Sequence, residues 1–270
     1  MKKTQSHLTI AIFNAFAFIA VLIVNSLANI IPLGGMNTGQ ISDLYPNLFV
    51  PAGLTFSIWG LIYILLALYV VYNFIYKVQE KDSRENFMDK IGYLFFFSSL
   101  GNICWVLSWH YRKMLLSLIS MLIILITLIY IYQVLVIGKS HISKKERFFV
   151  HLPFSVYLGW ITVATIANMT ALLVNMKWNG WGLSESFWTV AVIIVAILIG
   201  LLILLKRKDI AFVAVIDWAL LGILIKRRSL EGADSSQIVV SAVVFGLILL
   251  SSGIIYQIVR NLFFKDRNVL

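Results

Sequence analysis

Long apolar runs follow one another along almost the whole chain, separated by short polar segments. A membrane-spanning helix needs roughly 20 mainly apolar residues, and the runs lack the apolar–polar alternation of a barrel strand. We therefore predict that every run is a helix, because only helices and closed barrels satisfy all their backbone hydrogen bonds in lipid. The predicted spans cover residues 8–31, 53–76, 91–110, 114–137, 148–175, 186–205, 210–225 and 237–259.

This pattern predicts an all-α integral membrane protein, a polytopic bundle of about eight transmembrane helices. Segment 210–225 is the weakest of the eight, because its helix would be only about 24 Å long and it carries Asp217 near its middle. A bundle of seven spans is the alternative.

The composition supports a membrane location. Hydrophobic residues make up 60% of the 270 residues and charged residues 13%, whereas soluble domains are about half apolar and a quarter charged. The net charge of +10 comes from short basic clusters between the apolar runs. Such clusters are topology signals, so we expect no nucleic-acid partner.

The distribution of the basic residues predicts the orientation. With a cytoplasmic N-terminus, 16 of the 22 Lys and Arg residues fall on the cytoplasmic side, as the positive-inside rule requires. The same tally results for seven or eight spans. We therefore expect a multi-pass protein of the cell membrane, with its first span at 8–31 retained and not cleaved as a signal peptide.

One substantial loop, residues 32–52, is predicted on the outer side. It contains Pro32, Pro46 and Pro51, and no Lys or Arg. Apolar residues gather near its end, including Leu48 and Phe49, so we expect it to fold back onto the bundle.

No catalytic motif is present in the sequence, and we do not expect an enzyme. The four histidines lie near predicted helix ends, where an interfacial position is more common than metal ligation, so no metal site is predicted. Asp217 is the one ionisable residue well inside a predicted span. It is either an ion or proton site or a structurally paired acid, and a secondary transporter that uses Asp217 is the alternative function.

Aromatic residues and mid-helix asparagines form stripes at helical spacing on three predicted spans. Because the spans alternate in direction, the stripes meet in the outer half of the bilayer. They fit either a cavity for a flat apolar ligand or plain helix packing with asparagines as interhelical hydrogen bonders. The stripes are Phe56, Trp59 and Tyr63; Asn102, Trp105 and Trp109; and Tyr157, Trp160, Ala164 and Asn168. Four tryptophans, Trp109, Trp178, Trp181 and Trp188, fit an interfacial aromatic belt instead.

The sequence resembles the TspO/MBR family, the tryptophan-rich sensory proteins related to the mitochondrial translocator protein. The resemblance covers about residues 8–175. Its motifs are PAGLTFSIWGLIY from Pro51 to Tyr63, Asn102-Ile103-Cys104-Trp105 followed by Arg112, Val156-Tyr157-Leu158-Gly159-Trp160 with Asn168, and the loop from Leu44-Tyr45-Pro46 to Pro51. Val156 stands where the family has proline, and the loop lacks a tryptophan.

The resemblance implies a five-helix core, here residues 1–180 with the outer loop 32–52. Residues 181–270 would add three transmembrane helices. It implies a membrane sensor or regulator that binds a tetrapyrrole such as porphyrin or haem, or a sterol-like lipid, with no required cofactor. A homodimer in contact with membrane lipids is also implied. The expected ligand-binding residues are Tyr45, Pro51, Phe56, Trp59, Tyr63, Asn102, Trp105, Tyr157, Trp160 and Asn168.

Overall fold

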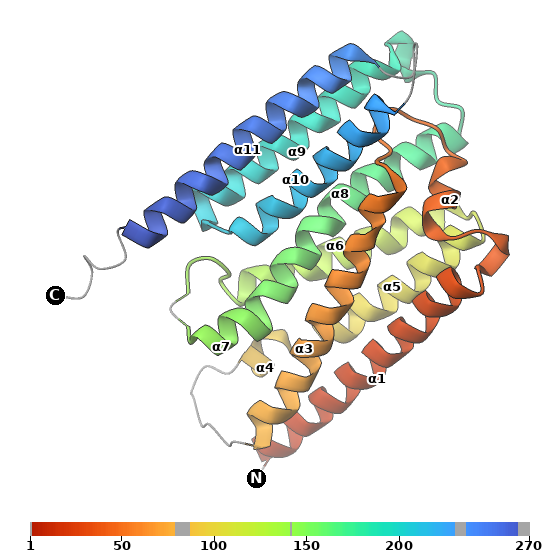
Figure 1. Ribbon diagram of the computed structural model, residues 1–270. Helices are drawn as coiled ribbons and strands as arrows, with labels where there is room; N and C mark the ends of the chain where they lie inside the picture. Colours follow the sequence, from red (N-terminus) through yellow and green to blue (C-terminus); the bar gives the residue numbers. More distant parts are fainter. Residues whose placement is uncertain (1, 79–86, 141, 230–235, 264–270) are drawn as a thin grey trace.

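The computed structural model describes residues 2–78, 87–140, 142–229 and 236–263. In these ranges the chain is helical and has no strand. The long helices lie side by side with roughly aligned axes, and they run in both senses along that direction (Figure 1). The predicted polytopic helix bundle is confirmed.

Five helices close into a ring. Along the ring, each helix packs against the next, in the order α1, α5, α6, α8, α3 and back to α1. Their bounds are α1 Lys2–Ile30, α3 Ile58–Val78, α5 Leu94–His110, α6 Met114–Val134 and α8 Leu152–Asn175. Shorter elements join them: η1 Leu33–Gly35, α2 Thr38–Asp43, η2 Gly53–Ser57, α4 Phe87–Ile91, α7 Lys144–Glu146 and η3 Arg147–His151.

The last three long helices pack on one side of the ring (Figure 1). They are α9 Glu185–Arg207, α10 Ile210–Arg228 and α11 Gln237–Phe263, with η4 Gly180–Gly182 before α9. Helix α10 lies between α8 and the α9–α11 pair. It approaches α8 closely at Gly159, where a Cβ atom would come 2.9 Å from the Phe212 carbonyl oxygen. One continuous hydrophobic core therefore joins the ring to the C-terminal helices.

A buried carboxylate fixes the start of α10. Asp209 accepts a backbone hydrogen bond from Phe212, 3.2 Å away, and so caps the helix. It also accepts hydrogen bonds from the Tyr132 hydroxyl of α6 (2.9 Å) and the Ser155 hydroxyl of α8 (2.7 Å). The cap thus ties α10 to two helices of the ring.

Six helices among the described residues are long and apolar enough to cross a membrane. The six are those of α1, α3, α6, α8, α9 and α11. Helix α5 runs beside them but has only 17 residues, and α10 carries Asp217 and three basic residues in its last turn. Segment 210–225 is nevertheless one continuous helix, extended to Arg228.

The loop 32–52 packs onto the end of the ring, as the sequence predicted. Ile41 and Phe49 are each 1% exposed. Helix α2 within the loop begins with a capping box, in which Asn37 and Gln40 each bond the other's backbone nitrogen. The loop is therefore an ordered cover.

The C-terminal helices hold this cover in place. The Leu48 backbone N–H donates to the Glu185 carboxylate at the start of α9, 2.7 Å away. The Ala52 N–H donates to the Gly222 carbonyl of α10 (2.9 Å), and the Trp218 indole N–H donates to the Thr55 carbonyl (3.0 Å). Three separate bonds therefore fix the segment from Leu48 to Thr55 on α9 and α10.

The contact at Gly222 leaves no room for a side chain. A Cβ atom there would lie 2.9 Å from the Thr55 Cβ, so rotation of the Thr55 side chain could not relieve the clash. We predict that Gly222→Ala lowers the free energy of unfolding by about 1–3 kcal/mol relative to Gly60→Ala, measured by thermal unfolding in detergent. Gly60 is the matched control because a Cβ there would meet no atom within 4 Å. Equal stability of the two variants would contradict the close contact.

Candidate functional site

Three tryptophans from three helices of the ring meet below the loop. Trp59 of α3 stacks on Trp105 of α5, with ring centroids 5.3 Å apart, and meets Trp160 of α8 edge to face at 6.2 Å. Phe56 also meets Trp160 edge to face, at 6.1 Å. The predicted stripes of the second, third and fifth spans therefore converge, at the end of the bundle that carries the loop.

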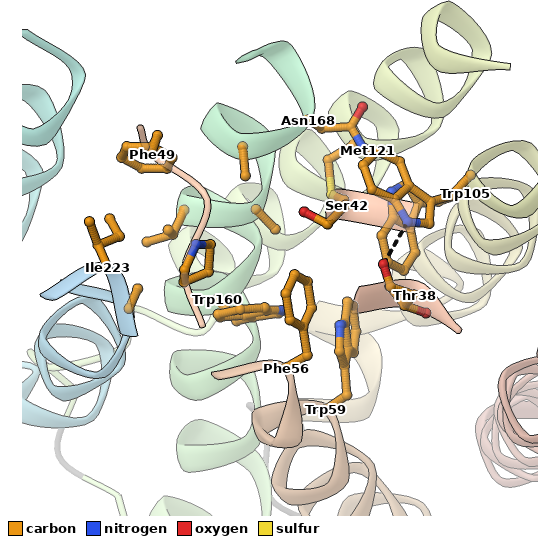
Figure 2. A pocket seen from close by; sticks show the side chains of 16 residues that line it. Thr38, Ser42, Phe49, Phe56, Trp59, Trp105, Met121, Trp160, Asn168 and Ile223 are labelled. Carbon is orange, nitrogen blue, oxygen red and sulfur yellow. Dashed lines mark hydrogen bonds between the residues drawn. The ribbon is translucent and has the colours of Figure 1, made fainter. Parts of the chain in front are cut away.

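These aromatic side chains surround a small, partly open cavity of about 40 Å³ (Figure 2). This volume holds roughly two or three water molecules. Six of the expected ligand-binding residues line it, namely Pro51, Phe56, Trp59, Trp105, Trp160 and Asn168. The other lining residues are Thr38, Ser42, Phe49, Trp109, Met121, Val163, Ala164, Ala167, Ala219 and Ile223.

Three buried polar groups on the cavity wall lack a hydrogen-bond partner. They are the indole Nε1 of Trp105, the indole Nε1 of Trp160 and the side-chain oxygen of Asn168. The Asn168 nitrogen is satisfied, because it donates to the Ser117 hydroxyl 2.9 Å away. An unsatisfied buried group costs about 1–3 kcal/mol, and these three belong to residues that line the cavity.

Asn102 and Tyr157 lie next to the cavity but do not line it. The Asn25 amide of α1 donates to the Asn102 oxygen (2.9 Å), and the Asn102 amide donates to the Tyr157 hydroxyl oxygen (3.1 Å). Tyr157 also contacts Trp59, with ring centroids 6.1 Å apart. This pair therefore positions the aromatic cluster by joining α1, α5 and α8, which fits the alternative of asparagine as an interhelical hydrogen bonder.

The loop covers the cavity and is held there by Trp109 of α5. The Trp109 indole N–H donates to the Thr38 carbonyl of α2, 3.2 Å away, and Tyr45 packs against the same ring at 6.2 Å. Trp109 is only 5% exposed, so the belt interpretation was wrong for this residue. Tryptophan at a helix end usually indicates an interfacial position, and here the folded loop buries it.

Burial raises the pKa of the Tyr45 hydroxyl, and the nearby positive charge of Arg112 partly lowers this pKa again.

Helix α10 contributes a wall that the sequence did not indicate. Ala219 and Ile223 both line the cavity, and Ile223 lies across it from Thr38 and Trp105 (Figure 2). Both are ordinary apolar residues in a segment outside the recognised motifs. Neither belongs to an aromatic or asparagine stripe, so their contact with the ring could be learned only from the fold.

An open cleft of about 660 Å³ lies beside the cavity, between α1, α2 and α3. Tyr63, which stacks on Trp59 at 5.6 Å, lines this cleft and not the cavity. The polar residues along the wall of the cleft include Asn25, Ser26, Asn29, Asn37, Gln40 and Asp43. Thr38, Phe56 and Trp59 line both spaces, so these three residues form the partition between them.

The remaining belt tryptophans pack together near η4. Ring centroids of Trp178, Trp181 and Trp188 are 5.1 to 5.5 Å apart, and the three rings line a second open groove of about 980 Å³ between α8 and α9. The belt assignment of these three stays a prediction.

Asp217 is separate from these spaces. It lines neither the cavity nor the two open grooves, and it accepts a hydrogen bond from Ser251 of α11 (2.7 Å). His110 and His151 are buried at helix ends, whereas His141 lies outside the described residues. Among the residues described, no group of three or more His, Cys, Asp or Glu could hold a metal ion.

We predict that Asn102→Ala destabilises the protein by about 1–3 kcal/mol, because it removes two interhelical hydrogen bonds and leaves Asn25 and Tyr157 without that partner. Thermal unfolding in detergent measures the change. Asn175→Ala is the matched control, since Asn175 is exposed at the end of α8. If both variants unfold like the wild type, Asn102 does not hold the three helices together.

The chain was compared with known proteins. The family model described as TSPO-like protein matches residues 11–256. This match extends past the motifs and includes α9, α10 and most of α11. Searches among curated proteins and among solved structures found no match. Because the family model covers most of its length, the chain belongs to the TSPO-like protein family.

Proposed function

We propose that this membrane protein is a sensor or regulator that binds a flat apolar ligand, a tetrapyrrole such as porphyrin or haem or a sterol-like lipid, in the aromatic cavity below the loop. The observation that carries the proposal is that three residues lining the cavity hold buried polar atoms without a partner, namely the indole nitrogens of Trp105 and Trp160 and the oxygen of Asn168. Unpaired polar groups beside stacked aromatic rings favour a flat guest with a polar edge.

The cavity must open before such a ligand enters. Pockets for drug-sized ligands have volumes of about 300–1,000 Å³, far more than the 40 Å³ of this cavity. The cleft beside it has about 660 Å³, and Thr38, Phe56 and Trp59 separate the two. Outward movement of this partition would join the cavity to the cleft and give a space of the required size.

The lining also constrains the charge of the ligand. None of the residues around the cavity is charged, and the charged residue of the cleft is the acidic Asp43, which pairs with Lys226 at 3.1 Å. A carboxylate inside the cavity would lose its hydration without gaining a cation. The ring of a porphyrin would therefore enter the cavity while its carboxylates stay in water.

The central test is ligand binding by tryptophan variants. Purified wild-type protein is expected to bind protoporphyrin with quenching of tryptophan fluorescence. Trp160→Leu removes an edge-to-face contact and an indole donor, each worth about 1 kcal/mol, so affinity should fall at least about tenfold. Trp181→Leu is the matched control, because Trp181 is 76% exposed and lies outside the cavity. Unchanged affinity in Trp59→Leu, Trp105→Leu and Trp160→Leu would reject this pocket.

A second test uses the uncharged lining. We predict that protoporphyrin dimethyl ester, which has no carboxylates, binds at least as tightly as the free diacid, measured by equilibrium titration at fixed salt. The Trp160→Leu substitution should lower the binding affinity for both ligands by the same factor. Much tighter binding of the diacid would show that a cation recognises the ligand, and would contradict the proposed orientation.

A further inference from the structure

Asp217 lies in an environment that favours a neutral carboxyl group. It is half-buried on α10, and the Ser251 hydroxyl of α11 donates to one of its oxygens at 2.7 Å. The other oxygen, Oδ1, is buried and has no hydrogen-bond partner. One hydroxyl donor compensates only a small part of the hydration that an ionised carboxylate loses.

The charged residues of α9 and α11, the two long helices packed against α10 on this side, lie in their first or last turns: Glu185, Lys206, Arg207 and Arg260. Helix α8, η2, α9 from Ser186 to Leu205 and α11 from Gln237 to Val259 contain no Asp, Glu, Lys, Arg or His. The titratable side chains in these stretches are the tyrosines Tyr157 and Tyr256. On α10 itself, the nearest basic residue along the helix is Lys226, about 13 Å away by helical rise.

We propose that Asp217 is a proton-binding site between α10 and α11, occupied at neutral pH. An ionised aspartate within an apolar helix bundle loses hydration, and protonation removes that cost. A metal cation is disfavoured, because hard cations take six or more oxygen ligands, whereas the side-chain oxygen bonded to Asp217 is that of Ser251. The site goes beyond the proposed ligand binding and does not depend on it.

A hydrophobic carbodiimide distinguishes the two states of the carboxyl. N,N′-dicyclohexylcarbodiimide reacts with a protonated carboxyl in an apolar setting. The acid proton moves to one carbodiimide nitrogen while the carboxyl oxygen bonds to the central carbon, and the O-acylisourea rearranges to a stable N-acylurea. The whole reagent is added, no group leaves and nothing is oxidised or reduced.

The experiment treats the full-length protein in lipid vesicles with this reagent and locates the adduct by mass spectrometry. We expect Asp217 to be labelled at pH 7 and Asp43, which is exposed and paired with Lys226, to remain unlabelled. Asp217→Asn removes the label. Ser251→Ala should extend labelling to higher pH, because the lost donor stabilised the ionised form, whereas Ser252→Ala, at the exposed neighbouring residue, should not.

An infrared spectrum gives a second readout that needs no access for the reagent. The carbonyl stretch of a neutral carboxyl should be present at pH 7 in the wild type and absent from Asp217→Asn. The proposal would be overturned if the wild type lacked that band at pH 7, or if Asp217 were labelled only near the ordinary aspartate pKa of about 4. Porphyrin binding by Asp217→Asn is expected to match the wild type, so failure of the proton site is distinguishable from failure of the ligand pocket.

Discussion

Lipid supplies no hydrogen bonds to the interior of a helix bundle, so every polar group there must find a partner within the protein. This constraint determines the connections between the helices. Asn102 joins α1 to α8, Asp209 joins α10 to α6 and α8, and Trp109 holds the loop to α5. The same constraint makes the exceptions informative. Trp105, Trp160, Asn168 and Asp217 each keep one buried polar atom unpaired.

These four residues lie in two separate places, and other unpaired atoms are found elsewhere in the bundle, among them the Asn14 oxygen and both polar side-chain atoms of Asn73. The two indole nitrogens and the Asn168 oxygen belong to residues that line one cavity, and we connect them with a ligand. The Asp217 oxygen lies between α10 and α11, and we connect it with a proton. Helix α10 contributes to both places, since Ala219 lines the cavity two residues after Asp217.

The structure gives the C-terminal helices a role in the candidate site. Helix α10 closes a wall of the cavity with Ala219 and Ile223. Together with Glu185 of α9, it also holds the covering loop through Gly222 and Trp218. The family match up to residue 256 agrees with one continuous core. A ligand that moves the loop must therefore also act on bonds made by α9 and α10.

The sequence by itself determined the helices, because long apolar runs without strand alternation form helices in lipid. It also determined the convergence of Trp59, Trp105 and Trp160, because helical spacing fixes the face of each side chain and the alternating direction of the spans fixes its depth. Only the tertiary structure decided what those side chains do there. Trp109 became part of the roof when the loop buried it, and Tyr63 faced the cleft. Ala219 and Ile223 became cavity wall through the close approach of α10. Periodicity defines the face of one helix, whereas its neighbours depend on the packing of side chains far apart in sequence.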